Sequence, residues 1–402
     1  MNKKYDIIVI GGGLVGLASA FKIQIKFPEK KILVLEKEKD LALHQSGRNS
    51  GVLHSGLYYE PGSHRASNCV LGRQELVNFA KKYKITHDVC GKLVVATNKA
   101  EASILPALLE RGKQNGLKGL QILNPAEMKE IEPFVNGSCA IWVPETGIID
   151  YRAVALKLKF LITEINPSSS VVTNAKVEGF YKYLSHSLVI TNSGRYECKN
   201  IVFCGGLFSD RLAKMDNLNL NMKIVGFRGD YYTLTKQAEN KVNNLIYPVP
   251  NPEFPFLGVH FTRMTNGEIE CGPNAVFTFK REGYKKLSFS FEDTVDALSY
   301  RGTWKLFKNH WRFGLNEFVK ATSKKVFLKH LQNLIPSLKM EDIKTGRSGV
   351  RAMALGQDGE VIDDFKILST DRNIHVLNAP SPAATACLSI GETISKELIK
   401  LI

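Results

Sequence analysis

The first 36 residues combine two short apolar runs with a glycine-rich turn and an amphipathic segment. Residues 5–10 end in four consecutive β-branched residues, a pattern typical of a parallel strand buried on both faces. Residues 14–27 place apolar side chains at helical spacing, and Pro28 ends that segment. Residues 32–35 form a second apolar run. This order predicts a strand, a helix and a second strand arranged as a parallel βαβ unit.

The turn before the predicted helix has the spacing GxGxxG at Gly11, Gly13 and Gly16. The first glycine permits the tight turn, the second lets a pyrophosphate approach the backbone, and the third lets helix and strand pack closely. The helix N-terminus supplies N–H groups and a positive dipole end for phosphate. Glu36, at the end of the second strand, is placed to bind a ribose hydroxyl, and we include Lys37 beside it. The unit predicts a dinucleotide cofactor without separating NAD from FAD.

A secretory signal peptide is the competing interpretation of this N-terminus. Lys3 and Lys4 precede an apolar run that ends in small residues at 18–20. The glycines at nucleotide-binding spacing argue against it, because cleavage would destroy the βαβ unit. No other run approaches the ~18 apolar residues of a membrane span, so we expect no transmembrane segment.

Residues 43–59 are rich in Gly, Ser and His and show little helical or strand pattern. Such a segment can wrap a ligand with backbone and hydroxyl groups. A solvated surface loop is the alternative, but Val52, Leu53 and Leu57 favour burial.

From this segment onward the chain carries a series of distinctive motifs. They are HQSGRNSGVLHSGLYYEPGS (44–63), IYPVP (246–250), FPFLGVHFTR (254–263), GPNA (272–275), REGY (281–284), GVR (349–351) and NAPSPAAT (378–385). The order of these motifs resembles that of the D-amino-acid oxidase-like superfamily of FAD oxidoreductases, and within it that of the L-2-hydroxyglutarate oxidase/dehydrogenase family. The likeness runs from Tyr5 to about Glu392. GxGxxG alone is not specific to this family, and the later motifs carry the resemblance.

The resemblance implies FAD as the cofactor and assigns residues to it. One group would contact the pyrophosphate or the flavin, a valine would touch the adenine through its backbone, and a second glycine turn would lie beside the dinucleotide. A C-terminal helix starting at Pro382 would point its dipole at the flavin pyrimidine, where charge accumulates on reduction. The residues are Ser46, Asn49 and Ser50, then Val177, then Gly205 and Gly206, and finally Ser381, Ala383 and Thr385.

Oxidation of a 2-hydroxy acid needs a base for the hydroxyl proton. His54 is the first candidate because it lies in the loop expected beside the flavin, and covalent attachment of FAD or a structural role are its alternatives. His260, in an aromatic strand-like run, is the rival base, and a core histidine is its alternative.

A dicarboxylate substrate needs cationic or hydrogen-bonding partners, and Arg suits planar carboxylates best. Arg351 is the main candidate and Tyr247 is a candidate hydrogen-bond donor, although it can also simply pack against Pro248. Arg228 and Arg263 are weaker candidates that are also consistent with surface charges. Asn274, after Gly-Pro, fits turn chemistry equally well.

The chain carries a net charge of +15, which suits acidic partners. It has no zinc-finger, RNP or basic-tail pattern, so we expect no nucleic-acid partner. Its seven cysteines are irregularly spaced without CxxC, which indicates free thiols in a reducing compartment and no zinc site. The expected location is the cytoplasm, with the cytoplasmic face of the inner membrane as the alternative.

Residues 297–332 contain eight Lys or Arg, one acid and seven aromatic residues. Trp304, Phe307 and Trp311 recur at helical spacing with basic residues between them. This pattern is typical of a helix that lies on an anionic membrane. It also fits a helix that buries its aromatic residues and exposes a basic face.

We therefore expect an α/β fold with a Rossmann-type FAD-binding domain and a discontinuous, mixed-sheet substrate domain. The FAD-binding domain would comprise 1–80, 145–225 and 340–402, and the substrate domain 81–144 and 226–339. The expected reaction is oxidation of L-2-hydroxyglutarate to 2-oxoglutarate by hydride transfer to flavin N5, with quinone or oxygen as electron acceptor. The alternatives are a related FAD enzyme for glycerol 3-phosphate or an amino acid, and a non-enzymatic flavin-binding or tRNA-associated protein.

Overall fold

A computed structural model describes residues 2–250 and 258–402 of the chain. The predicted βαβ unit is confirmed, with β2 (Ile7–Ile10), α1 (Leu14–Lys26) and β3 (Ile32–Leu35) each within about two residues of expectation. These strands lie in a six-stranded sheet whose first five strands are parallel and whose last is antiparallel to its neighbour. Its order is β10 (Ser170–Val172), β3, β2, β14 (Asn200–Phe203), β22 (Asn373–Asn378) and β21 (Lys366–Ser369).

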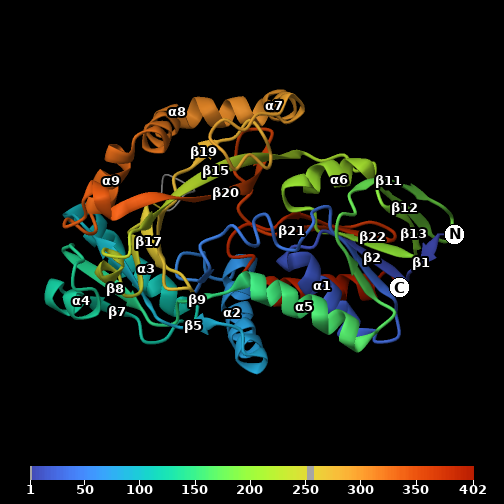
Figure 1. Ribbon diagram of the computed structural model, residues 1–402, viewed down its shortest axis with the longest axis horizontal. Coiled ribbons are helices and arrows are strands. Elements are labelled where there is room, and N and C mark those ends of the chain that lie inside the picture. Colours follow the sequence, from blue (N-terminus) through green and yellow to red (C-terminus); the bar gives the residue numbers. More distant parts are fainter. Residues whose placement is uncertain (1, 251–257) are drawn as a thin grey trace.

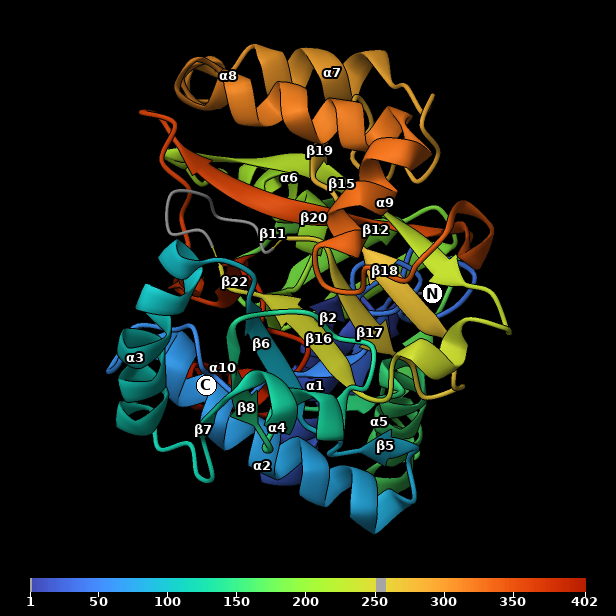
Figure 2. The same ribbon diagram turned by 90° about the vertical axis from the view of Figure 1, so that its left-hand side faces the viewer.

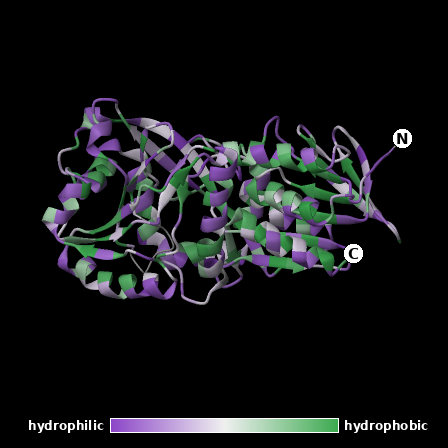
Figure 3. Cartoon of the chain, turned by 90° about the horizontal axis from the view of Figure 1, so that it is seen from below, coloured by the Kyte–Doolittle hydropathy of each residue, from purple (hydrophilic) through white to green (hydrophobic). Residues whose placement is uncertain are grey.

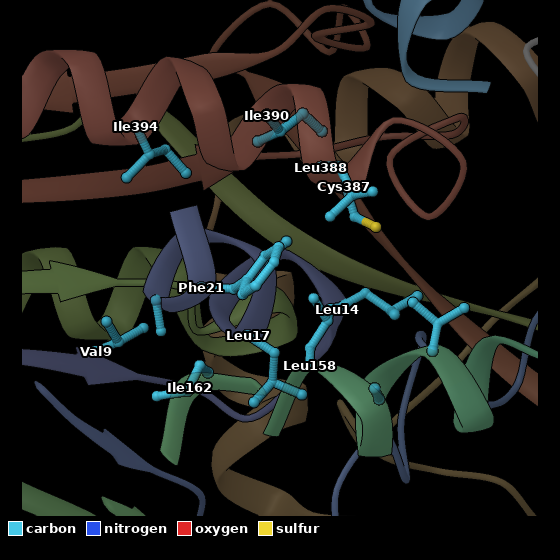
Figure 4. Packing of buried hydrophobic residues seen from close by; sticks show 14 of the residues in the cluster. Val9, Leu14, Leu17, Phe21, Leu158, Ile162, Cys387, Leu388, Ile390 and Ile394 are labelled. Carbon is cyan, nitrogen blue, oxygen red and sulfur yellow. The ribbon is translucent and has the colours of Figure 1, made fainter. Parts of the chain in front are cut away.

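Helices cover one face of this sheet and a small sheet covers the other (Figure 1). Helix α1 lies between α5 (Tyr151–Ile165) and α10 (Cys387–Ile399), with α2 (His64–Tyr83) packed against α10. Figure 4 shows the resulting core, in which Leu17 and Phe21 of α1 lie among side chains from its neighbours. The small sheet has the order β1 (Lys3–Lys4), β13 (Gly194–Cys198), β12 (Ser187–Thr191) and β11 (Val177–Lys182).

A large mixed sheet forms the other half of the molecule. Its longest strands pair antiparallel over most of their length, and both extend toward the first sheet (Figure 1). They are β15 (Met222–Leu234) and β20 (Ile343–Gly356). From β15 the sheet continues through β18 (Ile269–Gly272), β17 (His260–Arg263), β16 (Leu245–Pro248), β6 (Lys92–Ala96), β8 (Cys139–Val143) and β7 (Gln121–Leu123), with β19 (Val276–Phe277) on the other side of β15.

Helices flank the large sheet, and short elements join the two halves. Helices α3 (Lys99–Gln114) and α4 (Pro125–Ile131) pack near β7 and β8. Figure 2 shows α7 (Phe291–Leu298) and α8 (Arg301–Thr322) along the outer edge above β15 and β20, with α9 (Lys324–Gln332) following. The remaining elements are the small sheet of β4 (Val52–Leu53), β9 (Gly147–Ile149) and β5 (His87–Asp88), helix α6 (Ser209–Met215), and the 3-10 turns at Gly206–Phe208, Glu239–Lys241 and Met340–Asp342.

The distribution of polarity agrees with this layering. Figure 3 shows apolar positions along strands and helices of the half that holds both termini, interleaved with hydrophilic positions. Within residues 2–250 and 258–402, none of the helices combines the length and apolar character that crossing a bilayer requires.

The expectation for the C-terminal helix was wrong at its start. The helix begins at Cys387, whereas residues 382–386 form turns. Long-range hydrogen bonds hold this segment, because the Thr385 hydroxyl bonds to the Val52 carbonyl and to the Tyr151 hydroxyl. Such contacts fix a turn conformation that local helix propensity does not reveal.

Two further expectations concern the chain's division. The expected boundary at 340 assigns β20 to the FAD-binding part, whereas β20 pairs with β15 in the large sheet. The division into two domains itself stays a prediction.

Of the motif at 254–263, residues 254–257 lie outside the described part of the chain.

Candidate active site

A large cavity, of about 1580 Å³, runs between the carboxyl ends of the parallel strands and the large sheet. Ligands bind at this edge of open α/β sheets because loops from neighbouring strands diverge there. One end of the cavity is lined by the GxGxxG turn and Glu36, and the other by His54, His260 and Arg351. The cavity therefore joins the predicted nucleotide site to the predicted substrate site.

The glycines of the turn are required by close contacts. Gly11 has a φ of +114°, and a Cβ there would lie 2.3 Å from the carbonyl oxygen of Cys204. A Cβ on Gly16 would lie 2.0 Å from the carbonyl oxygen of Gly11. At Gly13 a Cβ would meet only the Ser46 hydroxyl, at 3.0 Å, and this glycine faces the cavity. The turn thus has the cradle shape that a pyrophosphate needs at the N-terminus of α1.

Glu36 and Lys37 lie at the end of β3 and both line the cavity. The Glu36 carboxylate accepts hydrogen bonds from the backbone N–H groups of Gly12 at 2.7 Å and Glu38 at 2.9 Å. Lys37 forms ion pairs with Glu38 and Glu282, and these partners raise its pKa against the opposing effect of burial. The backbone therefore holds the Glu36 carboxylate in place at the predicted ribose position, while Lys37 is already engaged with acidic side chains.

The loop at 43–50 is fixed from within and from the large sheet. Ser46 accepts a hydrogen bond from the N–H of Leu14, the first residue of α1, at 2.9 Å. The Asn49 amide group donates to the carbonyls of Gln45 and Ser46 and accepts from Gly51, so its polar atoms hold the loop together. Ser46, Asn49 and Ser50 all line the cavity.

Arg347 of β20 ties this loop to the large sheet, a role that the sequence did not predict. Its guanidinium donates to the carbonyls of Gly47 at 2.8 Å and Asn49 at 2.6 Å and forms a two-pronged ion pair with the buried Glu270. Gly349 follows on the same strand, and a Cβ there would lie 2.4 Å from the Arg48 carbonyl oxygen. The GVR motif thus brings the strand directly against the cofactor loop.

The other candidate cofactor residues divide into lining and supporting positions. The lining residues come from β11, from the turn after β14 and from the turns before α10, and they are Val177, Gly205, Gly206, Ser381 and Ala383. Thr385 is fully buried and does not line the cavity. Its hydroxyl accepts the backbone N–H of His54 at 3.1 Å, so it positions that residue.

His260 lies on β17, is 3% exposed and lines the cavity. Its Nδ1 lies 2.8 Å from the Gly258 carbonyl oxygen, which can only accept, so Nδ1 carries the proton and Nε2 keeps its lone pair. The ring stacks on Tyr247 with centroids 3.9 Å apart. Burial lowers the pKa of His260 to about 3, so the ring is neutral near pH 7. A neutral, oriented imidazole is the form that can accept a proton.

His54 lies directly after β4, also on the cavity wall. Its Nε2 is 3.5 Å from the Ser381 hydroxyl, and its carbonyl accepts from the Cys69 thiol. Burial and, to a smaller degree, the nearby charge of Lys92 lower its pKa to about 3. The structure thus brings both candidate bases to one end of the cavity. The choice between them, and covalent attachment through His54, stay predictions.

Arg351 and Tyr247 reach the same end from different strands. Arg351 lies two residues after Gly349 on β20, and its charge contributes to the low pKa of both histidines. Tyr247 on β16 lines the wall, while its hydroxyl oxygen is buried without a hydrogen-bond partner of good geometry in the described part of the chain. Both positions agree with a role in binding substrate, which stays a prediction.

The weaker candidates lie elsewhere. Arg228 is buried in an ion pair with Asp230, and Arg263 pairs with Asp88; neither lines the cavity. The Asn274 side chain accepts the N–H of Asp230 at 2.7 Å, which agrees with a structural role for this residue. Arg263 and Asn274 are occupied by partners far away in the sequence, whereas Arg228 pairs with an acid two residues away on its own strand.

Three residues at the substrate end of the cavity were not identified from the sequence. Tyr58 and Arg65 line the cavity, and Lys92 donates a hydrogen bond to the Tyr58 hydroxyl. The sequence feature that could have identified Lys92 is its position in the apolar run KLVVA of β6. Such a run is typically buried, and a lysine is rarely buried unless it has a partner or a function.

The chain matches the family described as FAD dependent oxidoreductase over residues 6–397. The chain belongs to this family. Proteins similar in sequence include the L-2-hydroxyglutarate dehydrogenase of Indibacter alkaliphilus, 47% identical over 98% of this chain and 99% of that protein. The Escherichia coli K12 protein of the same name is 41% identical over 99% of this chain and 94% of that protein. The mitochondrial human L-2-hydroxyglutarate dehydrogenase is 42% identical over 99% of this chain and 89% of that protein.

Solved structures share the fold. The L-alpha-glycerophosphate oxidase of Mycoplasma pneumoniae, with FAD bound, has a TM-score of 0.79 at 22% identity and covers 99% of this chain and 94% of that chain. Glycine oxidase of Geobacillus kaustophilus has a TM-score of 0.74 at 15% identity and covers 99% of this chain and 95% of that chain. The expected α/β fold of the FAD oxidoreductases is thereby confirmed, and FAD is the cofactor that the family uses. The glycine cradle, the held Glu36 carboxylate and the size of the cavity fit that cofactor.

Proposed function

We propose that the protein oxidises L-2-hydroxyglutarate to 2-oxoglutarate. The observation that carries the proposal is the full-length similarity, at 41–47% identity, to proteins named L-2-hydroxyglutarate dehydrogenase, together with a cavity end that holds an arginine and two neutral histidines. FAD, when bound, supplies the electron sink that accepts a hydride from the substrate carbon.

The side chains present can perform the proton chemistry. His260 is our preferred base because its Nδ1–H is held by the Gly258 carbonyl and its Nε2 lone pair is left for the substrate hydroxyl. His54 is the alternative base, and its ring lies in the same electrostatic environment. Arg351 would bind a substrate carboxylate, since a guanidinium forms two parallel hydrogen bonds with that group.

A substrate panel tests this function. Purified holoenzyme with an artificial electron acceptor should turn over L-2-hydroxyglutarate and leave D-2-hydroxyglutarate untouched. Turnover of glycerol 3-phosphate or of an amino acid instead would favour the alternative FAD enzymes. If no small acid reduced the acceptor and the protein bound RNA in a salt-sensitive way, a non-enzymatic role would be favoured.

For the electron acceptor we propose quinone or oxygen, and for the location the cytoplasm or the cytoplasmic face of the inner membrane. The seven cysteines, all without a disulfide partner, suit a reducing compartment. A quinone would be reached at a membrane surface, so the relevant element is α8, which lies at the outer edge of the molecule (Figures 1 and 2).

The aromatic residues of α8 divide between core and surface. Phe307 packs on Phe277 with centroids 5.3 Å apart, whereas Trp304 and Trp311 are 58% and 56% exposed. The helix is not continuous, because His310 has non-helical dihedral angles. Exposed aromatic residues on a basic helix support contact with an anionic membrane, and the buried ones support the packing that we gave as the alternative.

Vesicle binding tests the membrane contact. The protein should sediment with phosphatidylglycerol vesicles at low salt and not with phosphatidylcholine vesicles, and the double change Trp304→Ser and Trp311→Ser should weaken sedimentation. Tyr181→Ser, on the exposed face of β11, is the matched control and should have no effect. Equal sedimentation by all three proteins would contradict this contact and leave oxygen or a soluble acceptor.

A further inference from the structure

Lys92 is a buried basic side chain beside the substrate end of the cavity. It opens β6, is 1% exposed, and forms no ion pair within residues 2–250 and 258–402. A buried ammonium group is costly unless it is paired and hydrogen-bonded. The position of this lysine beside the substrate end of the cavity suggests that its partner belongs to a ligand.

The contacts of Lys92 are two tyrosines that line the cavity. Its Nζ lies 3.3 Å from the Tyr58 hydroxyl oxygen and 4.4 Å from the centre of the Tyr58 ring. It also lies 4.9 Å from the centre of the Tyr247 ring. When Lys92 is protonated, its ammonium group only donates hydrogen bonds, so the Tyr58 oxygen accepts and the Tyr58 proton is left to point elsewhere. Tyr58 faces the cavity, so that proton is available to a bound ligand.

The groups around Lys92 are cationic or neutral. His54 and His260 come from the cavity wall, Arg351 from β20 and Arg65 from α2, and the Cys69 thiol lies beside them. Arg65 is itself neutralised by an ion pair with Asp363. Burial lowers the pKa of Lys92 to about 7, and Cys69 opposes this only in part. Both histidines keep their pKa near 3, so in this group Lys92 is the side chain that titrates near neutral pH.

We propose that Lys92 positions the Tyr58 hydroxyl for a substrate carboxylate and takes up a proton from solvent when the dicarboxylate binds. The proton returns to solvent when the ligand leaves, so no net proton is consumed by this step. Lys92 acts through Tyr58 and through its charge, and it is therefore a positioning residue. The inference rests on the proposed function, because it assumes a doubly anionic ligand at this end of the cavity.

Proton uptake is the measurable consequence. With a pKa lowered to about 7, Lys92 is mostly neutral at pH 8 and mostly protonated at pH 6. Binding of 2-oxoglutarate to the oxidised holoenzyme should therefore take up more protons at pH 8 than at pH 6. Calorimetric titration in two buffers that differ in ionisation enthalpy, phosphate and Tris at pH 8 and MES and Bis-Tris at pH 6, measures this number, and 2-oxoglutarate cannot reduce the flavin.

Three variants separate this role from a purely structural one. Lys92→Met should bind 2-oxoglutarate about tenfold or more weakly at pH 6, the size expected for loss of a hydrogen bond to a charged group, and should take up no proton at pH 8. Lys92→Arg keeps its charge at both pH values, so it should bind well at pH 8 without uptake. Tyr58→Phe should bind more weakly yet still take up the proton. Flavin content and melting temperature check that each variant folds.

The outcomes also separate the inference from the proposed function. Wild-type protein that binds 2-oxoglutarate and oxidises the L-acid, but shows no pH-dependent uptake, overturns the inference and leaves the function standing. Uptake that persists in Lys92→Met assigns the proton to another group and equally overturns it. A wild-type protein that binds no dicarboxylate and oxidises no hydroxy acid overturns both.

Discussion

Replacing His260 by Asn tests the proposed base with little disturbance of the fold. The Asn side-chain amide can still donate to the Gly258 carbonyl, which His260 now contacts through Nδ1 at 2.8 Å, but it has no counterpart of the Nε2 lone pair. Loss of the ring stack on Tyr247 should cost about 0.5–1.5 kcal/mol of folding free energy. Loss of a general base costs about 10²–10⁴-fold in rate, which is about 3–5 kcal/mol of activation free energy.

Stopped-flow reduction of the flavin under anaerobic conditions measures this step directly. We expect His260→Asn to lower the rate of reduction by L-2-hydroxyglutarate at saturation, with flavin content retained. His54→Gln is the matched control at the same end of the cavity, and we expect a smaller loss there. A loss of less than tenfold in His260→Asn together with a large loss in His54→Gln would refute the assignment and make His54 the base.

Four further outcomes follow from the same contacts. The folded-state pKa of His260 lies below its unfolded value, so its contribution to folding stability is fully present above about pH 6.5 and is lost as pH falls toward 3, with about 2 kcal/mol lost by pH 5. Chemical unfolding should therefore show a smaller difference in unfolding free energy between pH 7 and pH 5 for His260→Asn than for the wild type. Arg351→Met should raise the KM for L-2-hydroxyglutarate about 10- to 100-fold, measured by steady-state turnover. Arg347→Met leaves the buried Glu270 carboxylate unpaired, which should cost about 3–5 kcal/mol in denaturant unfolding and weaken FAD retention on gel filtration. Gly16→Ala places a Cβ against a backbone carbonyl and should yield protein without bound flavin, seen in its absorbance spectrum.

The parts of the fold that could be predicted are those set by local pattern. The βαβ unit was found to within about two residues because its strands are continuous apolar runs and its glycines mark the turn. The start of α10 was predicted wrongly, because the turns before it are held by contacts of Thr385 with Val52 and Tyr151, which lie far away in the sequence. Sequence periodicity reports neighbours three or four residues apart and carries no information on such contacts.

The candidate site divides in the same way. The lining glycines and the histidines lie in motifs, and the structure brings them to one cavity. Arg347 and Lys92 act on partners more than 30 residues away, so their roles appear only once β20 meets the cofactor loop and β6 meets Tyr58. The opposite error concerns Arg228, a candidate cation whose ion pair with Asp230 is made on its own strand and was overlooked.

The central claim is that the chain uses FAD to oxidise one enantiomer of a hydroxy dicarboxylate. The most direct test is the anaerobic flavin absorbance spectrum before and after addition of L- or D-2-hydroxyglutarate. We predict rapid bleaching with the L-form alone, which would identify cofactor, substrate and stereochemistry together. A yellow protein that stays oxidised with both enantiomers would contradict the substrate assignment and direct the search to glycerol 3-phosphate and amino acids.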